Sequence, residues 1–114
     1  MEYTEYTVTA GGGVSVTVPV FHGEENACRM NLFYETALSE LYRYGCELTE
    51  NDRRGGFFCR PSVTEEDGIV VVSLQLTRRR SGEPSARKTV VHRWQDGYLR
   101  REKKMRSGNR LRSK

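Results

Sequence analysis

Two segments near the start of the chain alternate between apolar and polar residues. Residues 3–9 are rich in Tyr and Thr, and residues 14–20 place four valines on one face and polar side chains on the other. This period of two is typical of β-strands. The glycines at 11–13 favour a turn between them, because glycine is costly inside a regular element. The pattern therefore predicts a β-hairpin.

The hydrophobic period then changes from two residues to three or four over residues 24–44. The apolar residues that share this spacing are Met30, Phe33, Ala37, Leu38, Leu41 and Tyr44. This is the pattern of one amphipathic helix. Glu24 and Glu25 suit the positive end of the helix dipole, and Gly45 is a typical residue at a helix end. We therefore expect one long helix that ends at Gly45.

The rest of the chain returns to strand-like patterns. We expect strands at residues 56–63, 69–79, 86–94 and 98–101, with polar loops at 47–56 and 79–85. Asp67-Gly68 and Asp96-Gly97 are strong signals for tight turns between antiparallel strands.

The order of these elements is β-β-α-β-β-β followed by a short strand, which is typical of the α+β class. We expect an antiparallel β-sheet packed on one long amphipathic helix. In this arrangement Phe33, Leu38 and Leu41 of the helix pack against the valine faces of the strands.

Charge is distributed unevenly along the 114 residues. The net charge is +4, but residues 1–99 carry 11 Lys or Arg against 14 Asp or Glu, a net of −3. Residues 100–114 carry 8 against one, a net of +7. We therefore expect a single domain over residues 1–101 and a flexible basic tail over 102–114.

The tail has two interpretations. Its basic residues suit an electrostatic arm for nucleic acid or acidic lipid, or they keep the chain soluble. They are Arg100, Arg101, Lys103, Lys104, Arg106, Arg110 and Arg112.

Several protein classes are disfavoured by what the sequence does not contain. The longest apolar run, residues 69–72, is far shorter than the ~20 residues of a membrane span, and the start of the chain has no signal peptide pattern. Three cysteines without a C-x-x-C pair favour reduced thiols and disfavour zinc. We expect a cytoplasmic protein with no membrane span, no metal and no cofactor.

No catalytic motif stands out in the sequence. The signatures of phosphate loops, dinucleotide sites, zinc proteases and serine hydrolases are missing. A Cys-His pair such as Cys59 with His92 remains an alternative, and it would require a reactive thiol. We expect a non-enzymatic protein that acts by binding.

Basic and aromatic residues gather in the second half of the chain and form the candidate binding site. Trp94 and Tyr98 flank a tight turn and suit stacking across it. Such a surface favours a protein partner, and the alternative is single-stranded nucleic acid. Residues 3–9 are also a candidate edge strand for a homodimer. The candidate binding residues are Arg78, Arg79, Arg80, Arg87, Lys88, Arg93, Trp94 and Tyr98.

One segment carries a family resemblance. Residues 19–23 (Pro-Val-Phe-His-Gly), an acidic spacer, and Met30-Asn31 at the start of the helix resemble a bacterial domain family of unknown function. That family is found in the extracytoplasmic domain of the anti-sigma factor RsiV and in some peptidoglycan deacetylases. The likeness extends over residues 3–101. It implies an α+β fold and a binding role, with no active site to carry over.

Overall fold

The computed structural model describes residues 1–23 and 25–100 of the chain. Six strands and one helix make up the fold in this part. They are β1 (Glu2–Ala10), β2 (Val14–His22), α1 (Ala27–Asn51), β3 (Gly56–Glu66), β4 (Ile69–Arg79), β5 (Ala86–Gln95) and β6 (Tyr98–Arg100). This order confirms the α+β prediction.

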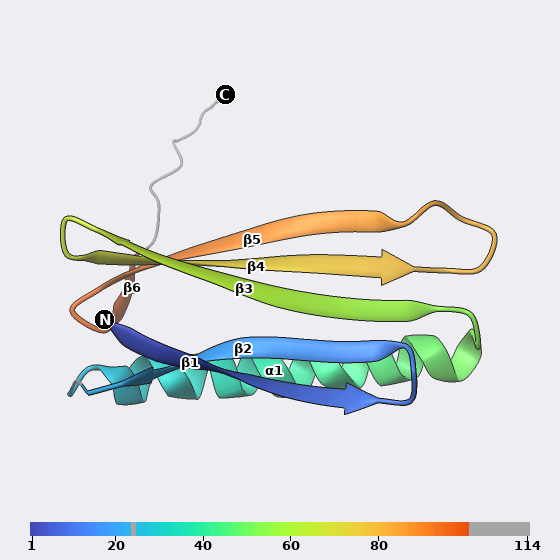
Figure 1. Ribbon diagram of the computed structural model, residues 1–114, viewed down its shortest axis with the longest axis horizontal. Helices are drawn as coiled ribbons and strands as arrows, with labels where there is room; N and C mark the ends of the chain where they lie inside the picture. Colours follow the sequence, from blue (N-terminus) through green and yellow to red (C-terminus); the bar gives the residue numbers. More distant parts are fainter. Residues whose placement is uncertain (24, 101–114) are drawn as a thin grey trace, which may run out of the picture.

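The six strands form one sheet in sequence order, β1-β2-β3-β4-β5-β6. Neighbouring strands are antiparallel except β2 and β3, which are parallel because α1 connects them. The helix lies along one face of the sheet, behind β1 and β2 in the view of Figure 1. The tight turns are confirmed, since Asp67, Gly68, Asp96 and Gly97 all have positive φ.

The parallel contact between β2 and β3 is short. Only Val14, Ser15 and Val16 pair with β3, and beyond them the two strands diverge into a fork (Figure 1). The backbone of Phe21 therefore lacks a β3 partner. Asn31 of α1 takes that place, since its Oδ1 accepts from Phe21 N at 2.8 Å and its Nδ2 donates to Phe21 O at 3.0 Å.

The hydrophobic core lies between α1 and the sheet and continues into the fork. Val14, Val16 and Val18 of β2 are buried, as the alternating pattern predicts, but Val20 is only partly buried and Phe21 takes its place in the core. Tyr34 of α1 is fully buried, and its ring contacts the rings of Phe21, Phe33 and Trp94. Of the helix residues expected to face the sheet, Phe33, Leu38 and Leu41 are partly buried against this core.

The predicted helix boundaries were wrong at both ends. The helix begins at Ala27 with no acidic residue in its first turn, and it continues through Gly45 to Asn51. Gly45 is needed for packing, because a Cβ there would lie 2.9 Å from Val14 Cγ1 and 3.2 Å from Phe57 Cβ. Helix and sheet approach each other too closely at this point for any side chain.

The β3 strand is longer than predicted and ends at Glu66 rather than at residue 63. Its last residues pair with the start of β4 up to the tight turn, so the hairpin determines where the strand ends. No helix in the described part of the chain is long and apolar enough to cross a membrane. The predicted flexible tail, residues 102–114, lies outside the described residues.

The bond pair from Asn31 to Phe21 should contribute to stability. Replacing Asn31 with Ala leaves one backbone donor and one acceptor in the fork without a partner, so we expect Asn31→Ala to lower the free energy of unfolding by about 1–3 kcal/mol. Urea unfolding measures the change. Ser39→Ala, at an exposed position of the same helix, is the control and should change stability by less than about 0.5 kcal/mol. Equal stability of the two variants would contradict this role.

Candidate functional site

A groove opens where α1 leaves the sheet uncovered, between the second half of the helix and strand β5. We call it the α1–β5 groove. Its volume is about 370 Å³, and it is lined mainly by apolar surface with cationic side chains at its rim. The lining residues are Leu41, Tyr44, Phe57, Leu76, Arg78, Ala86, Arg87 and Lys88.

The floor of the groove is fixed by an aromatic pair and one hydrogen bond. Tyr44 of α1 packs edge-on against Phe57 of β3, with ring centroids 5.1 Å apart. Arg78 Nη1 donates to Tyr44 Oη at 3.4 Å. This bond holds the pKa of Tyr44 below its usual value, because the guanidinium stabilises a phenolate. The same bond directs Arg78 toward the helix and places its charge at the groove.

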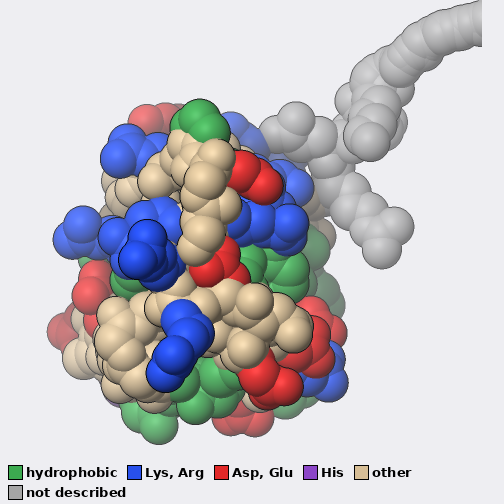
Figure 2. All heavy atoms as spheres, turned by 90° about the vertical axis from the view of Figure 1, so that its right-hand side faces the viewer, with side chains coloured by type: hydrophobic (Ala, Val, Ile, Leu, Met, Phe, Trp, Pro, Cys, Tyr) green, Lys and Arg blue, Asp and Glu red, His purple; other side chains and the backbone are tan. Residues whose placement is uncertain are grey.

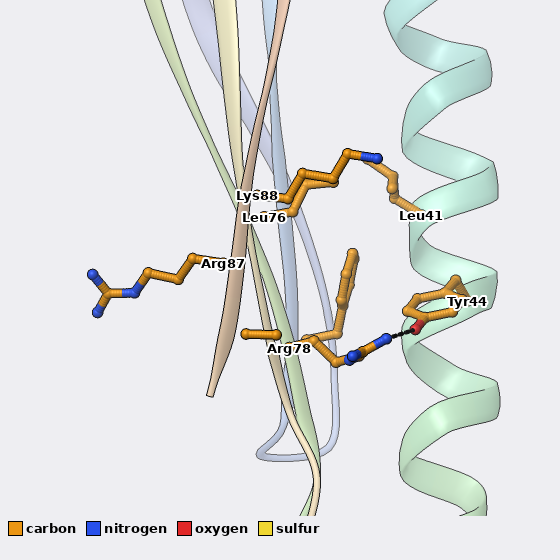
Figure 3. Close-up of a pocket in the computed structure, with 8 residues that line it drawn as sticks. Leu41, Tyr44, Leu76, Arg78, Arg87 and Lys88 are labelled. Atoms are coloured by element: carbon orange, nitrogen blue, oxygen red, sulfur yellow. Dashed lines mark hydrogen bonds between the residues drawn. The ribbon is translucent and has the colours of Figure 1, made fainter. Parts of the chain in front are cut away.

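Two neighbouring cations of β5 point to opposite faces of the sheet. Lys88 is paired with Leu76 of β4, and its side chain extends toward Leu41 on the helix (Figure 3). Arg87 points away from the groove on the other side of the strand (Figure 3). The charge at the groove therefore comes from Arg78 and Lys88, since successive strand residues face opposite ways.

The loop beside the groove is tied to the end of the helix by Asp52. Its Oδ2 accepts from Ser81 N at 2.7 Å, and its Oδ1 accepts from Ser81 Oγ at 2.5 Å. A further bond joins Oδ1 to Arg54 N at 3.1 Å. These bonds hold the pKa of Asp52 below its usual value. The β4–β5 loop is thus held next to the turn that follows α1.

This end of the molecule is strongly basic. Figure 2 shows Lys and Arg side chains gathered over its upper and middle part, with Asp and Glu side chains between and below them. We call this surface the basic end. The residues in its two loops and adjoining strand ends are Arg53, Arg54, Arg78, Arg79, Arg80, Arg87 and Lys88, against Asp52 and Glu83.

The structure distributes the sequence-predicted site residues over several surfaces. Arg78 and Lys88 meet at the groove, whereas Arg87 and Arg93 lie on the opposite face of the sheet, where they pair with Thr77 and Val71. On that opposite face Arg79 lies 5.0 Å from the ring centroid of Phe58. Arg80 is exposed at the start of the β4–β5 loop.

The two predicted aromatic residues do not share one surface. Trp94 is only 3% exposed and belongs to the core, and its cross-strand partner is Leu99 rather than Tyr98. Tyr98 is exposed, and Arg29 of α1 lies 3.9 Å above its ring. Of the predicted tail residues only Arg100 is described, at the end of β6. The others lie outside the described residues.

Sequence reasoning missed the apolar half of the groove. Leu41 and Tyr44 were interpreted only as core positions, and Phe57 and Leu76 only as strand residues. Alternation along the strands does separate Arg78 from Arg79 and Lys88 from Arg87. That signal assigns faces but does not show which face the helix leaves open.

In the first half of α1, a partly buried polar chain links the helix to β5. Trp94 Nε1 donates to Tyr34 Oη at 2.9 Å, and Tyr34 Oη lies 3.1 Å from His92 Nδ1. Tyr34 Oη accepts from Trp94 and has one hydrogen left to donate, and it donates to His92 Nδ1 in the tautomer of neutral His92 that carries its proton on Nε2. Burial raises the pKa of Tyr34 and lowers that of His92.

Cys59 and His92, the alternative catalytic pair, form hydrogen bonds to other residues. Cys59 Sγ donates to Thr17 O at 3.6 Å, and burial raises the pKa of the Cys59 thiol to about 11. This thiol is therefore protonated at neutral pH, and His92 is bonded to Tyr34 instead. Among residues 1–23 and 25–100, no group of three or more His, Cys, Asp or Glu side chains is placed to hold a metal ion.

The fold has a solved structural relative. A DUF3298 family protein from Pseudomonas aeruginosa, known from its crystal structure, is similar with a TM-score of 0.60 and 15% sequence identity. The similarity covers 86% of this chain and 52% of that one, so the chain spans about half the length of its neighbour. The neighbour thus belongs to a family named for its unknown function, and at this identity the likeness shows the fold alone. No protein-family model matches the sequence, and no curated protein matches it significantly.

The burial of His92 predicts a pH dependence of stability. Because His92 has a lowered pKa in the folded state, unfolding takes up a proton below about pH 6.5. Neutral His92 therefore makes its full contribution to the free energy of unfolding above that pH, and the contribution decreases as the pH falls below it. We expect urea unfolding between pH 7.5 and pH 5 to show a larger loss for the native chain than for His92→Gln, which keeps an acceptor for Tyr34 but does not titrate. His22 is common to both proteins, so equal losses would contradict the assignment.

Proposed function

We propose that this protein is a non-enzymatic binding module that recognises an anionic group attached to an apolar body, and that the α1–β5 groove is its binding site. The observation that carries the proposal is the composition of the groove. Its floor is apolar, and no acidic residue is found among the lining residues described above. The polar side chains directed toward it are those of Arg78, Lys88 and Tyr44, whereas the side chain of the third lining cation, Arg87, points away (Figure 3).

The groove combines two kinds of attraction. Burial of an apolar group against Leu41, Phe57 and Leu76 is favourable by about 25 cal/mol per Å². Arg78 and Lys88 then attract a carboxylate, sulfonate or phosphate at the rim. Because Tyr44 already orients Arg78, part of the ordering cost is met before the ligand arrives.

The chemistry of the lining residues supports binding rather than catalysis. None of the lining residues is a Cys, His, Ser, Asp or Glu, so the groove offers no nucleophile next to a base. The buried thiol of Cys59 and the neutral ring of His92 serve the core instead.

We further infer that the chain is distantly related to the bacterial family of RsiV and some peptidoglycan deacetylases. The solved DUF3298 neighbour supports a common fold. The residues of the resemblance also have a shared role here, because Asn31 bonds the backbone of Phe21 in the part of β2 that is separated from β3. A binding role, without an active site, is what this relation implies.

The groove predicts binding of 8-anilinonaphthalene-1-sulfonate, an aromatic dye with one anionic group. We expect fluorescence titration of the folded protein to show saturable binding that weakens with salt. Arg78→Gln and Lys88→Gln should each weaken binding by about fivefold, because each removes a charge-assisted contact.

Arg87→Gln is the matched control, since it removes one charge from the same strand on the opposite face (Figure 3). It should leave dye affinity within about twofold of the native value, allowing for screened long-range attraction. The groove assignment fails if Arg78→Gln and Arg87→Gln bind the dye equally well while unfolding shows that both are folded.

A second candidate function is binding of single-stranded nucleic acid, which the seven cations of the basic end favour. It lacks the stacking platform expected from the sequence, because Trp94 is buried in the core. If it operates, a labelled oligo-dT should bind at about 0.15 M salt with a steep salt dependence. The double variant Arg53→Gln/Arg54→Gln should weaken that binding and leave dye binding unchanged. Absence of oligo-dT binding by the full chain would eliminate this candidate.

A further inference from the structure

Among residues 1–23 and 25–100, no strand covers one backbone edge of β5 along most of its length. On one side it pairs with β4 from Ala86 to Gln95. On the other side β6 pairs only with residues 93–95, so β5 lies at the margin of the sheet (Figure 1). Within the described part of the chain, residues 86–92 have no strand on that side.

The turn geometry identifies the backbone groups that face outward. Asp96 and Gly97 both have positive φ, which is the two-residue turn whose flanking residues, Gln95 and Tyr98, share their hydrogen bonds. Every second residue of β5 counted from Gln95 therefore directs its backbone away from β4. In the free stretch these residues are Arg87, Thr89 and Val91, and each offers one N–H and one C=O.

Two neighbouring cations of this edge, Arg87 and Lys88, lie on opposite faces of the sheet. Arg87 projects from the outer face and Lys88 toward the groove (Figure 3). An acidic strand paired here would set opposite charges beside Arg87 and Lys88. Like charges directly opposite one another are destabilising, whereas opposite charges stabilise a strand pair.

We propose that the free edge of β5 is a docking site for an extended acidic peptide segment of a partner protein, which adds to the sheet as a further strand. The proposal rests on the function assigned to the α1–β5 groove and names its ligand. A docked strand turns alternate side chains to opposite faces. Its acidic residues then meet Arg87 on the outer face, and its apolar residues enter the groove beside Leu41 and Tyr44, with Lys88 at the rim.

The probe is a fluorescein-labelled, C-terminally amidated heptapeptide in which Glu alternates with Val. Fluorescence anisotropy with the full chain should show saturable binding that weakens with salt, and a peptide in which Lys replaces each Glu should not bind. Hydrogen exchange followed by NMR should show fast exchange at the amides of Arg87, Thr89 and Val91 in the free protein and protection of these amides with the acidic peptide.

The decisive pair of variants is Thr89→Pro and Thr89→Ala. Proline removes the one outward N–H at the centre of the edge and leaves the bonds to β4, since proline is tolerated on edge strands where its nitrogen faces solvent. Thr89→Ala keeps that N–H. We expect Thr89→Pro to bind the peptide at least about fivefold more weakly than Thr89→Ala, with both variants binding the dye as the native protein does.

Three results would overturn the inference. The first is that Thr89→Pro and Thr89→Ala bind the peptide equally well, or that the native protein does not bind the peptide at all. If dye binding still depends on Arg78 in that case, the groove function stands without strand addition. The second is protection of the three amides in the free monomer, which would assign the edge to the chain's own residues 101–114. The third is a native oligomer in sedimentation that Thr89→Pro converts to a monomer, which would assign the edge to a second copy.

Discussion

One helix has to cover the apolar face of a six-stranded sheet, and the rest of the structure follows from where it lies. α1 connects two parallel neighbours, β2 and β3, so it packs against the middle of the sheet and against β1 and β2 (Figure 1). The contact at Gly45 brings helix and sheet so close that no side chain fits between them. The first half of the helix contacts β5 through Tyr34, whereas beside Leu41 and Tyr44 the α1–β5 groove stays open between helix and strand.

The short parallel contact imposes a second requirement. Where β2 separates from β3, the fork exposes backbone groups that a sheet would normally pair. Asn31 bonds those of Phe21, and Tyr34 fills the space while linking Trp94 and His92 through its hydroxyl. The polar groups buried in the fork are bonded to one another, which is the condition under which burying them is tolerable.

The candidate site is positioned by residues that also stabilise the fold. Tyr44 packs on Phe57 as part of the helix–sheet contact and also orients Arg78. Asp52 ends the helix and also holds the β4–β5 loop through Ser81. The cations at the groove are thus placed by the same contacts that close the fold, so the charge next to the apolar floor is directed.

The order of elements, the hairpin turns and the buried valine face of β2 are determined by the sequence alone, because they depend on local periods and on turn residues such as Asp96 and Gly97. The charged residues that reach the groove, Arg78 and Lys88, were also identifiable, but as members of a larger basic set. The end of the helix was not predictable. Gly45 looks like a helix end in the sequence, but it is a glycine because it packs against Val14 and Phe57. Which face each arginine takes, the burial of Trp94 and the free edge of β5 were decided only by the tertiary structure, because they depend on strand pairing and helix placement between residues far apart in the sequence.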